Sequence, residues 1–234
     1  MQRTIAGLTM LTAATTLHAQ SQWYFVDDDA PEGGDGSSWE RAFRDLQSAF
    51  DAIDDAGPTF EIVIRIADGH YIAPGEGSTF GGVEGQSAST LSILGAFSGL
   101  GFERDPNRFT TTIDGDRLGD DTTGLLDRAD NAAHLLTIQA DGLHVHLDGL
   151  DLVHGGNSDS DAGGAILLDG ARSLTIADCM FEGNVAAIGG AISSGNIDLT
   201  IEHTEFVDNV AFDVGGAVSA VGNGNDLLFA STSF

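Results

Sequence analysis

The chain has 234 residues, enough for one domain or two small ones, and a formal net charge of −27 at pH 7. Its nine basic residues are all arginine, so the charge disfavours binding to nucleic acid or anionic membrane and favours cations and salty surroundings. A hydrophobic fraction of 41% with 32 glycines is typical of a folded, strand-rich chain with many tight turns.

Residues 1–20, MQRTIAGLTMLTAATTLHAQ, have the organisation of a secretory signal peptide. Arg3 gives a basic start, an apolar run extends from Ile5 to Leu17, and Ala19 is small enough to precede a cleavage site. The alternative is a first buried strand or helix, but the run is too short for a permanent membrane span and an acidic region follows. We therefore expect an exported protein, secreted or associated with the cell surface or outer membrane, whose mature chain has no transmembrane span.

Residues 21–58 are predicted to form a short strand at Trp23–Val26, an acidic loop and one amphipathic helix. Apolar residues at steps of three and four would share one helix face. They are Trp39, Ala42, Phe43, Leu46, Ala49, Phe50 and Ile53. Ser37 and Glu40 match a capping box, and Gly57–Pro58 supplies the stop.

Residues 59–140 are predicted to form short strands separated by glycine or aspartate turns, with no second helix pattern. The strand-like segments are EIVIRIADGHYI, which breaks at Asp68–Gly69, STLSILGAF, TTTIDGD and HLLTIQADG. FERDPNRF is predicted to be a loop between two of them.

Residues 141–234 carry a repeat with a period of about 26 residues, which is the mark of stacked structural units. A glycine-rich motif returns as GGAI at 163–166, GGAI at 189–192 and GGAV at 215–218. A second motif appears as VHLDGLDLVHG at 145–155, LTIADCMFEGN at 174–184, LTIEHTEFVDN at 199–209 and LLFASTSF at 227–234.

The aligned copies predict columns of residues that point into a common core. The first, third, sixth and eighth places of each copy are apolar or small, which suits two short strands with a bend between them. The columns are Val145, Leu174, Leu199 and Leu227; Leu147, Ile176, Ile201 and Phe229; Leu150, Cys179, Thr204 and Thr232; and Leu152, Phe181, Phe206 and Phe234.

The glycine-rich motif is predicted to supply the third side of each coil. Its glycine pairs allow positive φ or close approach at a corner, and its alanines point inward. These residues are Gly163, Gly164, Ala165, Gly189, Gly190, Ala191, Gly215, Gly216 and Ala217. The repeat thus predicts an all-β, right-handed parallel β-helix whose N-terminal helix caps the open end. A β-sandwich, the alternative, gives no reason for the period.

GGAI paired with FEGN and FVDN resembles the repeat of the polymorphic outer membrane proteins, in which GGA(I/L/V) alternates with FxxN. The segments YFVDDDAPEGGDGSSWERAFRDLQSAFDAI, IADGHYIAP and GAFSGLGFERDPNRF resemble the opening of large secreted β-helix proteins of environmental bacteria. The resemblance implies a pectin-lyase-like β-helix, exposed at the surface or secreted, adhesin-like and without an assigned reaction. The family pattern breaks off at Phe234, so we expect the chain to be the front part of a longer protein.

Outward carboxylates are candidate catalytic groups, because β-helix enzymes that cleave polysaccharides carry acids and calcium on one flank. The candidates are Asp148, Asp151, Asp178, Glu202 and Glu205, but no acid column persists for three coils. A lyase also needs a base, and Arg172 falls in a corner loop. Solvated surface charge is the favoured interpretation, so no catalytic site is predicted.

Two acidic, glycine-containing loops are candidates for a weak structural calcium ion, because calcium prefers oxygen ligands. The candidate ligands are Asp27, Asp28, Asp29 and Asp35 in one loop and Asp114, Asp116, Asp120 and Asp121 in the other. The second loop begins like an EF-hand but has Leu118 and Leu125 at ligand places. GNGNDLL at 222–228 resembles a single copy of a calcium-binding nonapeptide, which cannot build that site alone.

We predict structural roles for the remaining candidate residues. His144 and His146 share a strand face, but no third zinc ligand stands at a convincing spacing. Cys179, the lone cysteine, is predicted to be a core residue. Asn184 and Asn209 are predicted to satisfy backbone groups between coils.

We expect an exported β-helix protein with a structural or adhesin-like binding role, no bound cofactor other than the candidate calcium, and extracellular polysaccharide or surface proteins as partners. The alternative is a carbohydrate-active enzyme, a polysaccharide lyase or a glycoside hydrolase.

Overall fold

A computed structural model describes residues 21–54, 61–74, 78–81, 89–121, 127–139, 141–156, 161–221 and 226–234. The predicted signal peptide and the helix stop at Gly57–Pro58 lie outside these residues. The strands of the first half are β1 Ser21–Val26, β2 Glu61–Ala67, β3 Gly69–Ile72, β4 Ser78–Gly81, β5 Thr90–Phe97, β6 Thr111–Asp114, β7 Leu136–Gln139, β8 His144–Asp148 and β9 Asp151–Val153. Those of the second half are β10 Ile166–Asp169, β11 Ser173–Ala177, β12 Met180–Glu182, β13 Val185–Ile188, β14 Ile192–Ser194, β15 Asp198–Glu202, β16 Glu205–Val207, β17 Val210–Val214, β18 Val218–Ala220 and β19 Leu227–Ala230.

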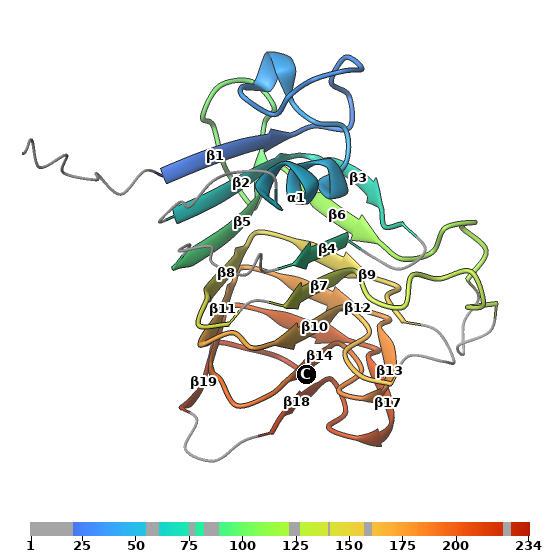
Figure 1. The fold of residues 1–234 in the computed structure, drawn as a ribbon. Helices are drawn as coiled ribbons and strands as arrows, with labels where there is room; N and C mark the ends of the chain where they lie inside the picture. The colour runs from blue at the N-terminus through green and yellow to red at the C-terminus, as the bar shows by residue number, and fades with distance from the viewer. Residues whose placement is uncertain are drawn as a thin grey trace, which may run out of the picture.

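Successive strands are stacked along the length of the molecule, and their pairing forms parallel sheets that extend along the stack (Figure 1). Sheet A has the order β1-β2-β5-β8-β11-β15-β19, sheet B the order β16-β12-β9-β6-β3, and sheet C the order β18-β14-β10-β7-β4. β13 and β17 pair separately. All pairs between these strands are parallel, so the prediction of a mostly β chain is confirmed. From β8 onward the chain visits sheets A, B and C in a constant order.

The strand register aligns the same residues as the sequence repeat. On sheet A, Leu174 lies opposite Val145 on one side and Leu199 on the other. On sheet B, Phe181 lies between Leu152 and Phe206. The rings of Phe181 and Phe206 stack with centroids 4.9 Å apart and planes 8° apart. Each inward position of the repeat forms a column of apolar side chains. The burial of these columns is the main stabilising contribution of such a stack.

The glycine pairs build the corner before sheet C. Gly163 and Gly189 have φ of 60° and 58°, and a Cβ on either would lie 2.1 Å from a backbone oxygen. Only glycine fits there without a shift of the backbone. The Ala165 N–H donates to the Ala191 C=O at 2.9 Å, and the Ala191 N–H donates to the Ala217 C=O at 2.8 Å.

The two asparagines connect neighbouring repeats at the turn that follows sheet B. Asn184 is fully buried, and its amide donates to the Leu152 C=O and to Asn209 Oδ1, both at 2.9 Å. Its Oδ1 accepts the Gly155 N–H at 2.8 Å. Asn209 in turn donates to the Phe181 C=O at 2.8 Å. These side chains satisfy backbone groups that the turn leaves without a strand partner.

The predicted long helix is wrong in its first half. A 3₁₀ turn covers Trp39–Arg41, and the α-helix α1 covers only Leu46–Asp54. Ser38 makes no side-chain cap; Asp45 caps α1 instead, with Oδ1 accepting the Ser48 N–H at 2.8 Å. The segment between them is extended because Phe43 pairs with the backbone of β1, through Phe43 N–H to Phe25 C=O and Asp27 N–H to Phe43 C=O.

The apolar residues that suggested one helix face therefore serve two cores. Leu46, Ala49, Phe50 and Ile53 enter the main core between the sheets. Trp39 and Ala42 pack with Phe25, Ala30, Ala67 and Phe97 in a smaller cluster outside sheet A. Figure 1 shows α1 at the blue end of the stack, beside β4. None of the described helices is long and apolar enough to cross a lipid bilayer.

Cys179 lies in the core column between the strands of sheets A and B. Its side chain is buried, and burial raises the pKa of its thiol to about 12. The thiol donates to the Ala177 C=O at 3.1 Å. A thiolate is therefore absent at neutral pH in the folded chain, as expected for a structural cysteine.

Candidate functional site

The first acidic loop is held by internal contacts. Asp35 forms an ion pair with Arg41 at 2.5 Å and accepts the Ser37 N–H at 3.1 Å. Asp28 Oδ2 accepts the His70 N–H at 3.1 Å, and Asp27 Oδ1 accepts the Asp29 N–H at 3.0 Å. Within the described part of the chain, these four aspartates do not supply three ligand atoms to one point.

The second acidic loop folds around the carboxylate of Asp116. Oδ1 accepts the N–H groups of Leu118, Gly119 and Asp120, and Oδ2 accepts that of Asp121, at 2.7–3.3 Å. Burial alone would raise the pKa of Asp116, but these hydrogen bonds outweigh it and lower the pKa. Asp116 is thus ionised and fixed in place.

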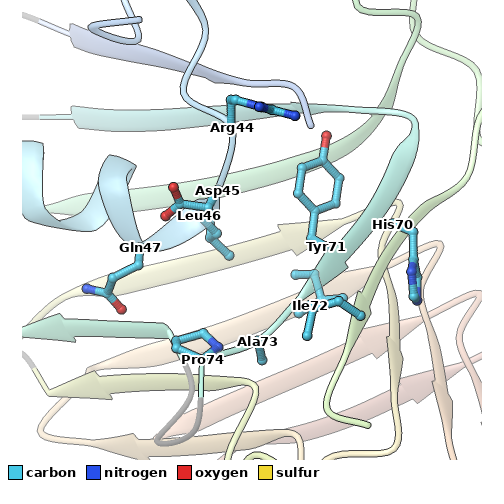
Figure 2. A pocket seen from close by; sticks show the side chains of 10 residues that line it. Arg44, Asp45, Leu46, Gln47, His70, Tyr71, Ile72, Ala73 and Pro74 are labelled. Atoms are coloured by element: carbon cyan, nitrogen blue, oxygen red, sulfur yellow. The ribbon is translucent and has the colours of Figure 1, made fainter. Parts of the chain in front are cut away.

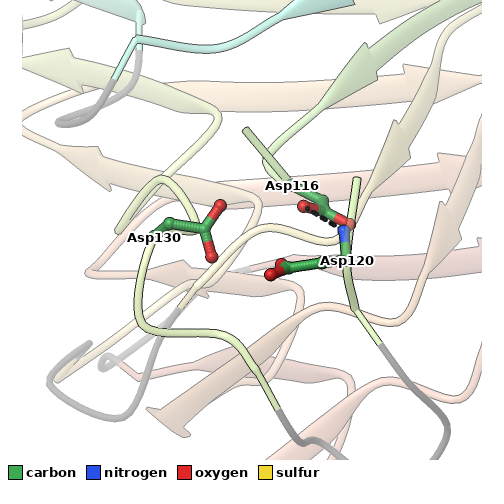
Figure 3. Close-up of side chains that lie close together, drawn as sticks. All are labelled: Asp116, Asp120 and Asp130. Atoms are coloured by element: carbon green, nitrogen blue, oxygen red, sulfur yellow. Dashed lines mark hydrogen bonds between the residues drawn. The ribbon is translucent and has the colours of Figure 1, made fainter. Parts of the chain in front are cut away.

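Asp120 and Asp130 complete a cluster with Asp116 (Figure 3). One oxygen from each of the three carboxylates lies within 4.8 Å of the others. Asp130 comes from the returning arm of the loop, where its Oδ2 also accepts the Leu118 N–H at 3.0 Å. Desolvation and repulsion from Asp130 and Asp116 raise the pKa of Asp120. A cation between the three carboxylates would relieve that repulsion, and hard oxygen ligands suit calcium.

The other two predicted calcium ligands of this loop point elsewhere. Asp114 lies at the end of β6 and binds two histidines: His70 Nε2 contacts Oδ2 at 2.8 Å, and His154 Nδ1 contacts Oδ1 at 3.0 Å. Asp121 faces Arg128 at 3.4 Å and accepts the Asn131 amide at 2.9 Å. The loop therefore contributes only Asp116 and Asp120 of the four predicted ligands to the carboxylate cluster.

The histidine–aspartate cluster bridges three strands of sheet B. His70 is on β3, Asp114 on β6, and His154 follows β9. The hydrogen bond to Asp114 outweighs desolvation and raises the pKa of His154. Burial raises the pKa of Asp114, but hydrogen bonds from His154, the Asp116 N–H and His70 reverse the effect and lower it. The cluster therefore behaves as an ion pair in weakly acidic solution.

A cavity of about 280 Å³ opens beside His70, between the start of α1 and β3 (Figure 2). Its lining includes Arg44, Asp45, Gln47 and Tyr71. The Tyr71 hydroxyl donates to the Ala67 C=O at 3.2 Å, and Arg44 donates to the Asp28 C=O at 3.0 Å. These contacts fix the walls, so the polar groups of the cavity serve the local structure.

The other residues singled out from the sequence are dispersed. His144 contacts the Ser173 hydroxyl at 2.7 Å, whereas His146 lies 3.7 Å from Asp148. Asp148 is held by Arg104 at 2.5 Å. Asp178 and Glu205 are exposed, and so is Arg172. In the part of the chain that the structure describes, the two histidines join no group of three metal-ligating side chains.

Five residues of these clusters were not predicted from the sequence: His70, His154, Arg128, Asn131 and Asp130. His70 and His154 are 84 positions apart, and only the register of sheet B brings them to Asp114. The alternation of β3 does place His70 on the outer face, which is the one signal available from the sequence.

Comparison with models of known protein families gives no match, and no curated protein or solved structure matches the chain.

The cluster predicts a specific pH dependence of stability. Because the pKa of His154 is raised above its ordinary value of 6.5, its contribution is fully present below about pH 6.5 and is lost as the pH rises through the folded-state pKa. His154→Asn keeps a donor and a residue that tolerates the local φ of 55° but removes the titration. Urea unfolding between pH 6 and 8 should show a decline in stability for the natural chain that the variant lacks; parallel curves would contradict the assignment.

Proposed function

We propose that the chain is an exported, right-handed parallel β-helix that acts as a structural and binding protein outside the cell or in its envelope. The constant visiting order of sheets A, B and C and the one-to-one register of the repeats support the β-helix. Export follows from the signal-peptide pattern of residues 1–20.

The binding role is supported by one observation: the repeated and the less exposed charged side chains serve the structure of the chain itself. The repeated residues stack in columns or satisfy backbone groups, as Phe181 and Asn184 do. Two acids with little exposure are held in local contacts: Asp116 by four N–H groups and Asp114 by two histidines. Such an arrangement supports a rigid scaffold with an acidic surface, whose ligands are extracellular polysaccharides or surface proteins.

Co-sedimentation with insoluble polysaccharides and with cell-envelope fractions tests this proposal, with and without calcium. We expect saturable binding without release of unsaturated or reducing ends. Steady release of such ends, or no binding to any of these materials, would overturn the binding role.

We also propose that Asp116, Asp120 and Asp130 hold a calcium ion weakly. With a dissociation constant of about 1 mM, typical of extracellular sites, about 5 mM calcium stabilises the fold by about 1 kcal/mol. The expected rise in melting temperature is about 2–4 °C for a chain of this size.

Thermal unfolding with calcium, and with magnesium at the same ionic strength, measures this effect. Asp130→Asn should abolish the shift, whereas Asp35→Asn, in the other acidic loop, should retain it. An equal shift in both variants, or an equal shift with magnesium, would mean that calcium acts through general charge screening.

One observation favours a hydrolase as the second candidate. Asp114 and Asp151 lie on neighbouring strands of sheet B and on the same face, since the register pairs Thr112 with Asp151. Desolvation and repulsion from Glu182 raise the pKa of Asp151, whereas that of Asp114 is lowered. Two carboxyl groups with opposite shifts are the arrangement of a general acid and a base. Release of reducing ends that Asp151→Asn abolishes would establish this alternative.

A further inference from the structure

Arg65 is surrounded by aromatic rings on the outer face of sheet A. Its guanidinium carbon lies 4.1 Å from the centre of the Trp23 ring and 5.0 Å from that of Phe102. Phe25 and Phe97 follow at 5.8 and 5.7 Å. The register explains the grouping, because Arg65 lies opposite Phe25 on β1, and Trp23 is two residues before Phe25 on the same face.

This arginine lacks the partner that other arginines of the chain have. Nε and Nη1 are buried and make no hydrogen bond. Arg41, Arg104 and Arg108 each contact a carboxylate at 2.5 Å, but no described carboxylate lies within ion-pair distance of Arg65. In a chain with 36 acidic residues, Arg65 is thus a cation held by aromatic rings, with no carboxylate partner among the described residues.

The aromatic residues around Arg65 form an open rim on a fixed base. Trp23 is 46% exposed and Phe102 is 70% exposed. The base is the small cluster that includes Phe25 and Phe97, both buried. The loop that carries Phe102 is closed by the Ser98 N–H to Glu103 C=O bond at 3.0 Å, and the Trp39 indole N–H donates to the Gly101 C=O. The rim is therefore arranged before any ligand arrives.

We propose that Trp23, Arg65 and Phe102 form a binding site for a carboxylated sugar. The apolar face of a sugar ring packs on an exposed aromatic ring, and its carboxylate accepts a charge-assisted hydrogen bond from Nη2, the guanidinium nitrogen that is not enclosed. A sugar ring that carries a carboxylate contacts the guanidinium and the aromatic rim at the same time. A neutral sugar leaves the arginine without a carboxylate partner. The site deepens the proposed function, on which it rests, by giving the polysaccharide ligand a chemical class.

The net charge of −27 does not prevent this contact. At physiological ionic strength the Debye length is about 8 Å, so distant acids are largely screened, whereas a partly buried ion pair is screened much less. The same acidic surface disfavours carboxylated ligands elsewhere, which makes Arg65 the favoured point of attachment.

The chain offers a direct optical reporter, because it has only two tryptophans. The full natural chain is the parent for this measurement, and Trp23→Phe, which keeps the buried Trp39, identifies the part of the signal that comes from Trp23. The tryptophan fluorescence of the parent is titrated with a glucuronic acid trisaccharide and with the methyl ester of the same trisaccharide. We expect a saturable change with the acid and binding at least about tenfold weaker with the ester.

Four substitutions in this parent chain test the site. Arg65→Met keeps the apolar stem and should weaken binding at least about tenfold, while Arg65→Lys, which keeps the charge but not the planar fork, should lose less. Arg172→Met removes an exposed arginine away from the site and should bind as the parent does. Phe102→Ser, at an exposed position, should weaken binding while leaving the unfolding curve unchanged.

Equal affinity of Arg65→Met and the parent would overturn the site, as would equal affinity for acid and ester. If the natural chain and Arg65→Met co-sediment equally with polysaccharide, the site is wrong and the proposed function stands. If the trisaccharide binds in an Arg65-dependent way but no polysaccharide or envelope fraction is retained, the site stands and the proposed function fails.

Discussion

Phe181→Ala is expected to lower the free energy of unfolding by about 3–5 kcal/mol. The Phe181 side chain is completely buried, and its ring stacks on that of Phe206 with centroids 4.9 Å apart. Truncation removes a large apolar area and leaves a cavity that the neighbouring strands cannot fill, because β12 is paired with β9 and β16 at a fixed register.

Urea denaturation measures this loss, with the slope of the transition as a check that unfolding stays comparable. Phe206→Ala should cost a similar amount, since Phe206 is only 5% exposed. Glu202→Ala, on the outer side of β15, should stay within about 0.5 kcal/mol. Equal losses at all three positions would contradict the inward and outward assignment.

Asn184→Ala is expected to cost about 3–5 kcal/mol, although it removes no apolar area. The change leaves the Gly155 N–H and the Leu152 C=O without their partners, and each orphaned buried group costs about 1–3 kcal/mol. Loss of the bond to Asn209 adds to this.

Asn209→Ala is the matched comparison for Asn184→Ala, because it removes the same side chain one coil later. Asn209 is half-buried, so water can replace part of its contacts and the loss should be about 1–2 kcal/mol. Chemical denaturation of both variants measures the two losses in the free energy of unfolding. A larger loss for Asn209→Ala than for Asn184→Ala would contradict the expectation that the more buried asparagine contributes more.

The regular part of the fold was predictable because each repeated residue has one local role. The period aligned Leu174 with Leu199, and the sheet register pairs the same two residues. Asn184 was predicted to satisfy backbone groups from its type and position alone. These predictions depend on spacing, which the sequence shows directly.

The N-terminal helix was mispredicted because a spacing of three and four cannot distinguish one helix from two packing surfaces. Trp39 and Phe43 fit the helical stripe, yet Phe43 pairs with β1. The hydrogen bonds that close the exposed edge of β1 outweigh helix propensity, which is a weak local preference.

The candidate sites were less predictable, because they join residues far apart in sequence. His70 and His154 reach Asp114 only through the order β3-β6-β9 in sheet B. Arg65 gave no signal, since its aromatic neighbours come from β1, β5 and the following loop. A single sequence shows which residues alternate on one strand, but it does not show which strands lie side by side.

The buried thiol of Cys179 can report how often the surrounding part of the fold opens. Because the folded thiol is protonated and enclosed, a thiol reagent reaches it only when the surrounding strands separate from their neighbours. The rate at which the thiol of Cys179 is modified thus measures how often the strands around it separate. No engineered probe is needed for that measurement, and no second cysteine blurs its interpretation.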